Sequence, residues 1–269
     1  TAVILISLLL LFTNTKYNYI FLAFSLVELI IFCYFLLAHS EYISRIKDFS
    51  WFKIHFKYGY TNVLSSTISV LSVNLLILIS GYYLSKAEAG IVSFIVTFTF
   101  VFSIISSSIQ IGFNPIFAKQ WAIKDLTGIN KHLKKIFKYN LLIFLPTFLS
   151  SFLLYYFYII LFMPAEFLST IKLFVVMALG ACINFTFSWP STMLNMGGFV
   201  NENLIRIILI FIVNILVSFV FIKFYGIEGV AISNLINPFF AISITYYLIR
   251  KYLNINIILI IAKSFKKYV

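Results

Sequence analysis

Long apolar stretches with almost no charge recur along the chain, separated by short polar segments. A helix needs about 20 apolar residues to cross the hydrocarbon core of a bilayer. Seven stretches are long enough: 17–39, 60–84, 89–113, 139–162, 171–195, 204–224 and 229–249. Their apolar residues run continuously and do not alternate with polar ones, as they would in a membrane β-strand. The pattern therefore predicts an all-α integral membrane protein, built as a multi-span helical bundle.

Residues 1–14 form a further apolar stretch that is shorter than the others. At about 1.5 Å per residue, this stretch is only about 21 Å long as a helix. The chain starts at Thr1, and neither a charged n-region nor a cleavage site comes before the stretch. We therefore expect a truncated span in a fragment that lacks its N-terminal part, and not a signal peptide.

Composition excludes a water-soluble enzyme. Hydrophobic residues make up 62% of the chain and charged residues 10%, and the mean hydropathy is +1.05. Soluble domains carry about 25% charged residues. The two cysteines, Cys33 and Cys182, both lie within apolar runs, so the sequence predicts neither a disulfide framework nor a cysteine metal site.

Positive charges are distributed unevenly between the two sides of the predicted bundle. The net charge is +12, and assigning the loops alternately places 16 cations on one side and 4 on the other. The poorer side holds Lys16, Lys86, Lys172 and Lys223. Cytoplasmic loops are rich in Lys and Arg, so we expect the basic side and the C-terminus to be cytoplasmic. Basicity here indicates topology, and no nucleic-acid partner is predicted.

The inward segment 114–138 is expected to be a basic loop, and its second half has helical spacing. Its lysines recur at intervals of three, four and seven residues, and apolar residues supply another side: Lys131, Lys134, Lys135 and Lys138, with Ile129, Leu133, Ile136 and Phe137. One interpretation of 127–138 is a helix resting on an anionic leaflet. The alternative is a solvated loop that fixes topology.

The sequence contains none of the common motifs for nucleotide binding, acid–base catalysis or metal binding. There is no G-x-x-x-x-G-K-[ST] motif, no close carboxylate pair, and no metal-ligand spacing around His39, His55 or His132. We therefore expect a transporter or channel and not an enzyme, with no cofactor and no metal.

Two spans carry polar stripes along one helix face. The residues are Thr61, Ser65, Ser69 and Ser72 in the first, and Thr99, Ser103, Ser106 and Gln110 in the second. Both stripes would line a hydrated cavity, or small hydroxyl residues would simply let helices pack closely. Gln110 is the better cavity candidate, because a long amide adds little to close packing.

Other polar groups inside the spans are candidates for function. Glu28 lies in the middle of its span, where it is a candidate for a protonation or coupling site, or is neutral and hydrogen-bonded to a neighbouring helix. Arg206 and Lys223 bracket span 204–224, and either snorkel to the interfaces or contact substrate. We expect the intramembrane asparagines to face protein or water: Asn74, Asn184, Asn214 and Asn234.

Several segments occur in an order that resembles a known family. Residues 56–59 (FKYG) enter a span and 81–91 (GYYLSKAEAGI) form an outward turn. A Ser-rich span then ends at 114–118 (NPIFA), and 224–233 (FYGIEGVAIS) joins the last two spans. Over residues 57–250 this resembles the second half of the Wzx-type O-antigen and polysaccharide flippases, in the MOP (MATE-like) exporter superfamily.

This resemblance implies a division of the chain. Residues 57–250 would form the second six-helix, MATE-like lobe, and 251–269 a basic cytoplasmic tail. Residues 1–56 would end the first lobe, with the truncated span 1–14, the span 17–39 and a cytoplasmic linker at 40–56. Gly90, Gly226, Gly229 and Pro115 would be fold-forming positions. Family members often carry an Asp-Arg pair in the middle of the first helix of this lobe, where Asn74 and Leu75 stand here.

The function implied is translocation of a polyprenyl-diphosphate-linked oligosaccharide across the bacterial cytoplasmic membrane for polysaccharide synthesis. Lys57, Lys119 and Arg206 would attract the diphosphate, and Gln110 would contact the sugar. Implied partners are membrane lipids and the polysaccharide polymerase and chain-length machinery. The alternatives are a MATE-like multidrug or ion-coupled exporter, an integral membrane polymerase or acyltransferase, and a structural membrane subunit.

Overall fold

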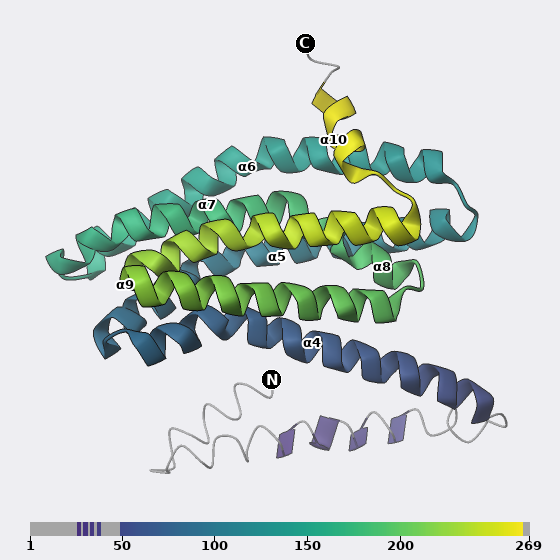
Figure 1. The fold of residues 1–269 in the computed structure, drawn as a ribbon, viewed down its shortest axis with the longest axis horizontal. Coiled ribbons are helices and arrows are strands. Elements are labelled where there is room, and N and C mark those ends of the chain that lie inside the picture. The colour runs from purple at the N-terminus through teal and green to yellow at the C-terminus, as the bar shows by residue number, and fades with distance from the viewer. Residues whose placement is uncertain (1–25, 28, 32, 35–36, 39–48, 266–269) are drawn as a thin grey trace. The chain divides into compact units, whose positions relative to one another are not determined.

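A computed structural model describes residues 26–27, 29–31, 33–34, 37–38 and 49–265 (Figure 1). The chain divides into two units, Thr1–Lys57 and Tyr58–Val269. In the first unit the described residues are helical, including those within predicted span 17–39. Predicted span 1–14 and Glu28 lie outside the described residues.

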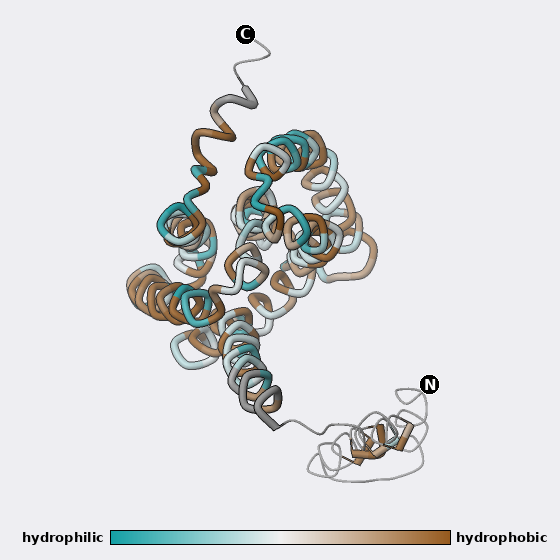
Figure 2. Tube along the Cα trace, turned by 90° about the vertical axis from the view of Figure 1, so that its right-hand side faces the viewer, coloured by the Kyte–Doolittle hydropathy of each residue, from teal (hydrophilic) through white to brown (hydrophobic). Residues whose placement is uncertain are grey.

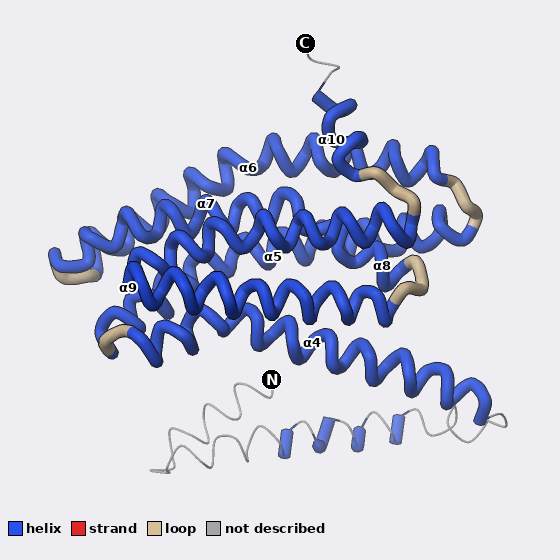
Figure 3. Tube along the Cα trace, in the orientation of Figure 1, coloured by secondary structure: helices blue, strands red, loops and turns tan. Residues whose placement is uncertain are grey.

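Every regular element in the described part of the chain is helical (Figure 3). The elements are α4 (Phe49–Tyr83), α5 (Lys86–Ala122), α6 (Leu126–Phe162), η1 (Ala165–Ser169), α7 (Thr170–Ser188), η2 (Trp189–Thr192), α8 (Met193–Met196), α9 (Val200–Leu253) and α10 (Ile257–Phe265). Five helical segments of the second unit are long and apolar enough to cross a membrane: Tyr58–Tyr83, Lys86–Ala122, Leu126–Phe162, Ala165–Met196 and Val200–Leu253. The predicted all-α, multi-span bundle is confirmed.

The last of these helices, α9, consists of two limbs that turn back at Gly226. Gly226 has φ +59° and ψ −135°, a backbone conformation that residues other than glycine rarely adopt. A Cβ at Gly229 would collide with the backbone of Phe221, so the limbs meet closely just after the turn. The predicted spans 204–224 and 229–249 are therefore the two limbs. Gly90, in contrast, lies inside α5, and a Cβ added there would have no neighbour within 4 Å.

Helices occupy nearly all of 114–138, so the expected loop is wrong, whereas the helical alternative for 127–138 is confirmed. α5 continues through Pro115 to Ala122, and α6 begins at Leu126, so only three residues, Ile123–Asp125, connect them. The basic segment 127–138 is continuous with the span that follows it. Charged residues end an apolar stretch but do not end a helix, since exposed lysines have good helix propensity.

A local cap explains the sharp turn between α5 and α6. Lys124 adopts the left-handed conformation with φ 56°, and Asp125 caps the start of α6. Asp125 Oδ1 accepts a hydrogen bond from the Gly128 N–H at 2.8 Å and another from the Thr127 hydroxyl at 2.7 Å. These two hydrogen bonds hold the pKa of Asp125 below its usual value. With its start capped in this way, α6 can follow α5 after a connection of only three residues.

The C-terminal region is more structured than a simple basic tail. α9 runs to Leu253, Asn254 takes a left-handed conformation with φ 56°, and α10 follows. α10 packs against α6 and α9, and Ile257 and Ile260 are buried there. The apolar residues of this segment therefore join the core, which charge counting alone does not indicate.

Two prolines that fall within predicted spans, Pro190 and Pro238, differ in their effect on the helix. α7 ends at Ser188, and Pro190 is the second residue of the 3₁₀ turn η2 that follows. Pro238 lies inside the second limb of α9, which continues as helix on both sides of it. A proline near the end of a helix stops it, whereas one in a well-packed interior is accommodated.

α7 lies at the centre of the second unit. It packs against α5, α6 and α9, and the buried residues form two clusters along the bundle. In one cluster, Trp189 contacts the rings of Phe113 and Phe137, with centroids at 5.0 and 5.2 Å. In the other, Tyr155 stacks on Phe174 at 4.0 Å and its hydroxyl meets Thr170 Oγ1 at 2.7 Å.

α7 approaches the second limb of α9 closely at Gly180. A Cβ on Gly180 would collide with the carbonyl group of Asn234 in the second limb of α9. Nearby, Asn234 Nδ2 donates a hydrogen bond to the Met177 carbonyl oxygen at 2.9 Å. Absence of a side chain thus lets the two backbones touch, a common arrangement in membrane helix pairs.

Gly180→Ala is expected to lower the free energy of unfolding by about 1–3 kcal/mol, since the added methyl group must displace the Asn234 backbone. Denaturant unfolding of the purified chain in an uncharged detergent measures this change. Gly112→Ala in α5 is the control, because nothing lies within 4 Å of its Cβ position. That control should be neutral or stabilising by about 0.5–1 kcal/mol. Equal losses in the two variants would contradict the close contact.

Candidate functional site

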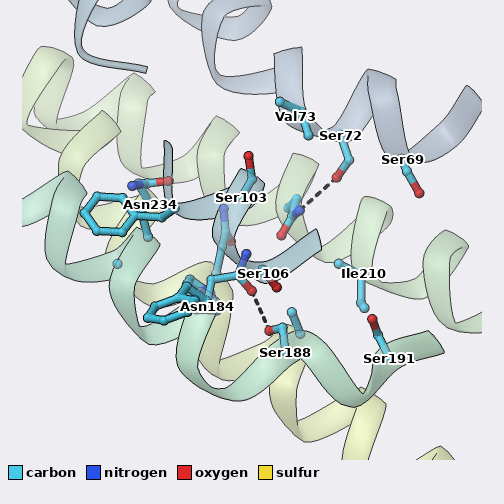
Figure 4. A pocket seen from close by; sticks show the side chains of 18 of the residues that line it. Ser69, Ser72, Val73, Ser103, Ser106, Asn184, Ser188, Ser191, Ile210 and Asn234 are labelled. Atoms are coloured by element: carbon cyan, nitrogen blue, oxygen red, sulfur yellow. Dashed lines mark hydrogen bonds between the residues drawn. The ribbon is translucent and has the colours of Figure 1, made fainter. Parts of the chain in front are cut away.

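A polar cavity of about 480 Å³ lies inside the second unit, between α4, α5, α7 and both limbs of α9. Figure 4 shows side chains from these helices converging on it. Hydroxyl and amide groups dominate its polar lining: Ser69, Ser72, Thr99, Ser103, Ser106, Ser107, Gln110, Asn184, Ser188, Ser191, Asn214, Ser218, Asn234, Asn237 and Thr245. No residue of α6 contributes to this lining, so α6 lies behind α7 and α5.

The polar stripe predicted on α5 lines the cavity along its full length. Thr99, Ser103, Ser106 and Gln110 are all lining residues. Many of these hydroxyls donate to their own helix: Thr99 Oγ1 to the Val96 carbonyl at 3.0 Å and Ser103 Oγ to the Phe100 carbonyl at 2.6 Å. Their oxygens keep lone pairs, so this wall offers acceptors to a ligand rich in hydroxyl donors.

The polar stripe predicted on α4 lines the cavity at one end and packs against protein at the other. Ser69 and Ser72 line the cavity, whereas Thr61 and Ser65 are buried and do not. Asn214 on the first limb of α9 donates a hydrogen bond to Ser72 Oγ at 3.0 Å, so the hydroxyl links α4 to α9 across the cavity (Figure 4). The same stripe therefore contributes to the cavity at one end and to packing at the other.

Arg206 is the cation in the lining. Its Nε donates to Asn203 Oδ1 at 2.9 Å and its Nη1 to Thr245 Oγ1 at 3.4 Å, so it joins the start of one limb of α9 to the end of the other. Both partners are neutral side chains. Among the lining residues that the structure describes there is no carboxylate, so the guanidinium charge is available to an anion.

The other predicted site residues lie elsewhere. Lys119 is exposed in the last turn of α5 and does not line the cavity. Lys57 is the last residue of the first unit, and its side chain is outside the described part of the structure. Glu28 also lies outside the described residues. Of the five candidates, the structure brings together Gln110 and Arg206.

Three of the four intramembrane asparagines line the cavity, namely Asn184, Asn214 and Asn234. Asn74 does not, and its Nδ2 donates to the Val70 carbonyl of its own helix at 3.0 Å. Ser188 donates a hydrogen bond to Asn184 Oδ1, which fixes that amide within the wall (Figure 4).

Sequence reasoning missed a stripe on the second limb of α9. Asn237 and Thr245 line the cavity with Asn234, at intervals of three and eight residues that keep all three on one helix face. Extending the stripe search from the Ser-rich spans to amides would have found Asn237. The remaining lining groups near the 3₁₀ turn η2, Ser188 and Ser191, have no periodic signal.

No protein-family model, no curated protein and no solved structure matches the chain. The structure shows helices long and apolar enough to cross a membrane, with a polar cavity between them. Within the described residues, no three His, Cys, Asp or Glu side chains gather where they would hold a metal ion.

A cysteine at the cavity wall should react with a water-soluble maleimide, because thiols react as thiolates, which require water. In a chain with Cys33 and Cys182 replaced by Ala, Ser106→Cys is expected to label about tenfold or more faster than Ser108→Cys. Ser106 lines the cavity, where water would reach it. Ser108, two residues further along, lies outside the lining on the outer surface of the helix, which would face lipid. The measurement is the labelling rate in proteoliposomes. Equal rates would mean that the cavity is dry or that this face of α5 is wrongly assigned.

Proposed function

We propose that the chain is part of a flippase that moves a polyprenyl-diphosphate-linked oligosaccharide across the bacterial cytoplasmic membrane. The observation that carries this proposal is the cavity: hydroxyls and amides from four helices, together with Arg206, inside a bundle of membrane-length helices. It agrees with the sequence resemblance to polysaccharide flippases over residues 57–250. The proposal includes a cytoplasmic C-terminus, following the distribution of basic residues.

The lining suits a sugar chemically. Sugar hydroxyls both donate and accept hydrogen bonds, and the wall offers hydroxyl oxygens as acceptors and amide groups as donors and acceptors. A volume of about 480 Å³ is in the range of about 300–1,000 Å³ typical of small-molecule sites. This wall would therefore hold part of an oligosaccharide head.

Charge in the cavity favours an anionic head group over a cationic one. Arg206 faces neutral partners, and a guanidinium binds phosphate oxygens in a bidentate way. The diphosphate of a lipid-linked sugar supplies such oxygens. A cationic drug would meet a like charge here, which makes the multidrug exporter the weaker alternative.

Gene deletion tests the function in the cell. The expected phenotype is loss of surface polysaccharide, with lipid-linked oligosaccharide accumulating on the inner leaflet, restored by the intact gene. Recruitment of the polysaccharide polymerase and chain-length machinery is a further part of the proposal. Unchanged polysaccharide together with altered drug sensitivity would instead support an exporter.

Arg206→Gln is expected to reduce complementation of the deletion about tenfold or more, because the amide keeps hydrogen bonding but loses the charge that would bind phosphate. Arg206→Lys should retain part of the activity, since charge remains without the fork geometry. The measurement is surface polysaccharide at matched protein levels.

Lys223→Gln is the control for that variant. Lys223 lies on the same limb of α9, is exposed, and sits 5.7 Å from the Phe219 ring centroid, away from the lining. Activity should not change. Full complementation by Arg206→Gln would remove the arginine from the mechanism without contradicting the cavity.

A further inference from the structure

The exposed face of α6 changes character abruptly at Tyr139. Before it, the exposed residues include Lys131, Lys134, Lys135 and Lys138. After it, the exposed residues are mostly apolar, beginning with Leu142 and Ile143. Lys135 Nζ lies 5.9 Å from the centroid of the Tyr139 ring. Tyrosine with a neighbouring lysine is typical of the boundary between hydrocarbon and headgroups, which places that boundary at Tyr139.

Helix geometry then gives the depth of each lysine. Headgroups add about 5–8 Å to each side of the hydrocarbon core. At about 1.5 Å per residue, Lys138, Lys135 and Lys134 lie about 2–8 Å beyond Tyr139, and Lys131 lies about 12 Å beyond it. The backbone positions of these three lysines therefore fall at headgroup depth, and the side chain of Lys131 is long and flexible enough to reach that layer.

α10 packs against α6 and exposes apolar side chains at the same end of the bundle as this basic face. It packs on α6 through buried Ile257 and Ile260, while Ile258 and Leu259 remain 65% and 48% exposed. Asn256 caps its start, with Oδ1 accepting from the Leu259 N–H at 3.1 Å. Figure 2, which views the end where α6 begins, shows α10 as mainly hydrophobic. A short helix exposing apolar residues at the same end of the bundle as these lysines is suited to the interface of a bilayer.

Charge at this end of the bundle is strongly positive. Further exposed cations lie at the end of α5, in the connector that follows it and at the end of α9: Lys119, Lys124, Arg250 and Lys251. In the part of the chain that the structure describes, the carboxylates at this end are Asp125, which caps α6, and Glu202, in the first turn of α9. The lysine face of α6 therefore complements negative charge at the membrane surface.

We propose that the lysine face of α6 (Lys131, Lys134, Lys135 and Lys138), with Ile258 and Leu259 of α10 at the same end of the bundle, binds anionic phospholipids of the adjacent leaflet. The lysines contact the phosphate groups, and the two α10 side chains contact the acyl chains. This site is separate from the cavity, because no residue of α6 or α10 lines the cavity.

Titration of the purified chain in an uncharged detergent, with phosphatidylglycerol or phosphatidylcholine, tests the site. Native mass spectrometry counts the lipids bound. Phosphatidylglycerol should bind more tightly, and the triple variant Lys131→Gln, Lys134→Gln, Lys135→Gln should weaken it about a hundredfold, the sum of three surface lysines. The corresponding Arg variant should keep the affinity, which separates loss of charge from loss of fold.

The matched control removes three exposed lysines from the opposite end, where α5 and α7 begin and the first limb of α9 ends: Lys86→Gln, Lys172→Gln and Lys223→Gln. This variant has the same change in net charge and should bind phosphatidylglycerol as the unaltered chain does. Ile258→Asn with Leu259→Asn should weaken binding about tenfold by removing the acyl-chain contact.

Two outcomes would overturn the proposal: equal affinity of the unaltered chain for the two lipids, or equal loss in the α6 variant and its control. Unchanged affinity in the α10 variant would refute the role of α10. Transport is not measured, so failure here leaves the proposed function standing, and failure of the flippase assay leaves the lipid site standing.

Discussion

Polar side chains in a membrane helix must face protein or water, since hydrocarbon offers them no hydrogen bond. The second unit depends on this constraint. Many Ser, Thr, Asn and Gln side chains of α4, α5, α7 and α9 are turned toward one cavity, while leucine, isoleucine and phenylalanine side chains are prominent on the outer surface. Arg206, the most costly of these groups to bury, is held by two neutral hydrogen-bond partners at the same cavity.

Close backbone packing keeps this cavity in shape. Gly180 allows α7 to touch the second limb of α9, and the Asn234 side chain adds a hydrogen bond across the same contact. α7 is in turn packed against α6 through Tyr155 and Thr170. The helix at the centre of the bundle is thus fixed on two sides, and the polar wall that it contributes has a defined position.

Much of the fold could be predicted from sequence, because lipid imposes a simple rule on length and polarity. The same rule identified the α5 stripe and Gln110 as cavity candidates, whereas for Arg206 it left open snorkelling to the interface or contact with substrate. Helix ends were predicted poorly: lysines close a membrane span, yet α5 and α6 continue as helices beyond it. The position of Lys119 and the packing of α10 depend on tertiary contacts that no local pattern encodes, as does the division of the α4 stripe.

The turn at Gly226 has a consequence for how such a wall changes during evolution. The two limbs of α9 are joined without a loop, and the contact of Gly229 with Phe221 fixes their register. Inserting one residue after the turn would rotate the second limb by about 100°. Asn234, Asn237 and Thr245 would then leave the cavity together, so this hairpin accepts substitutions one at a time but resists changes in length.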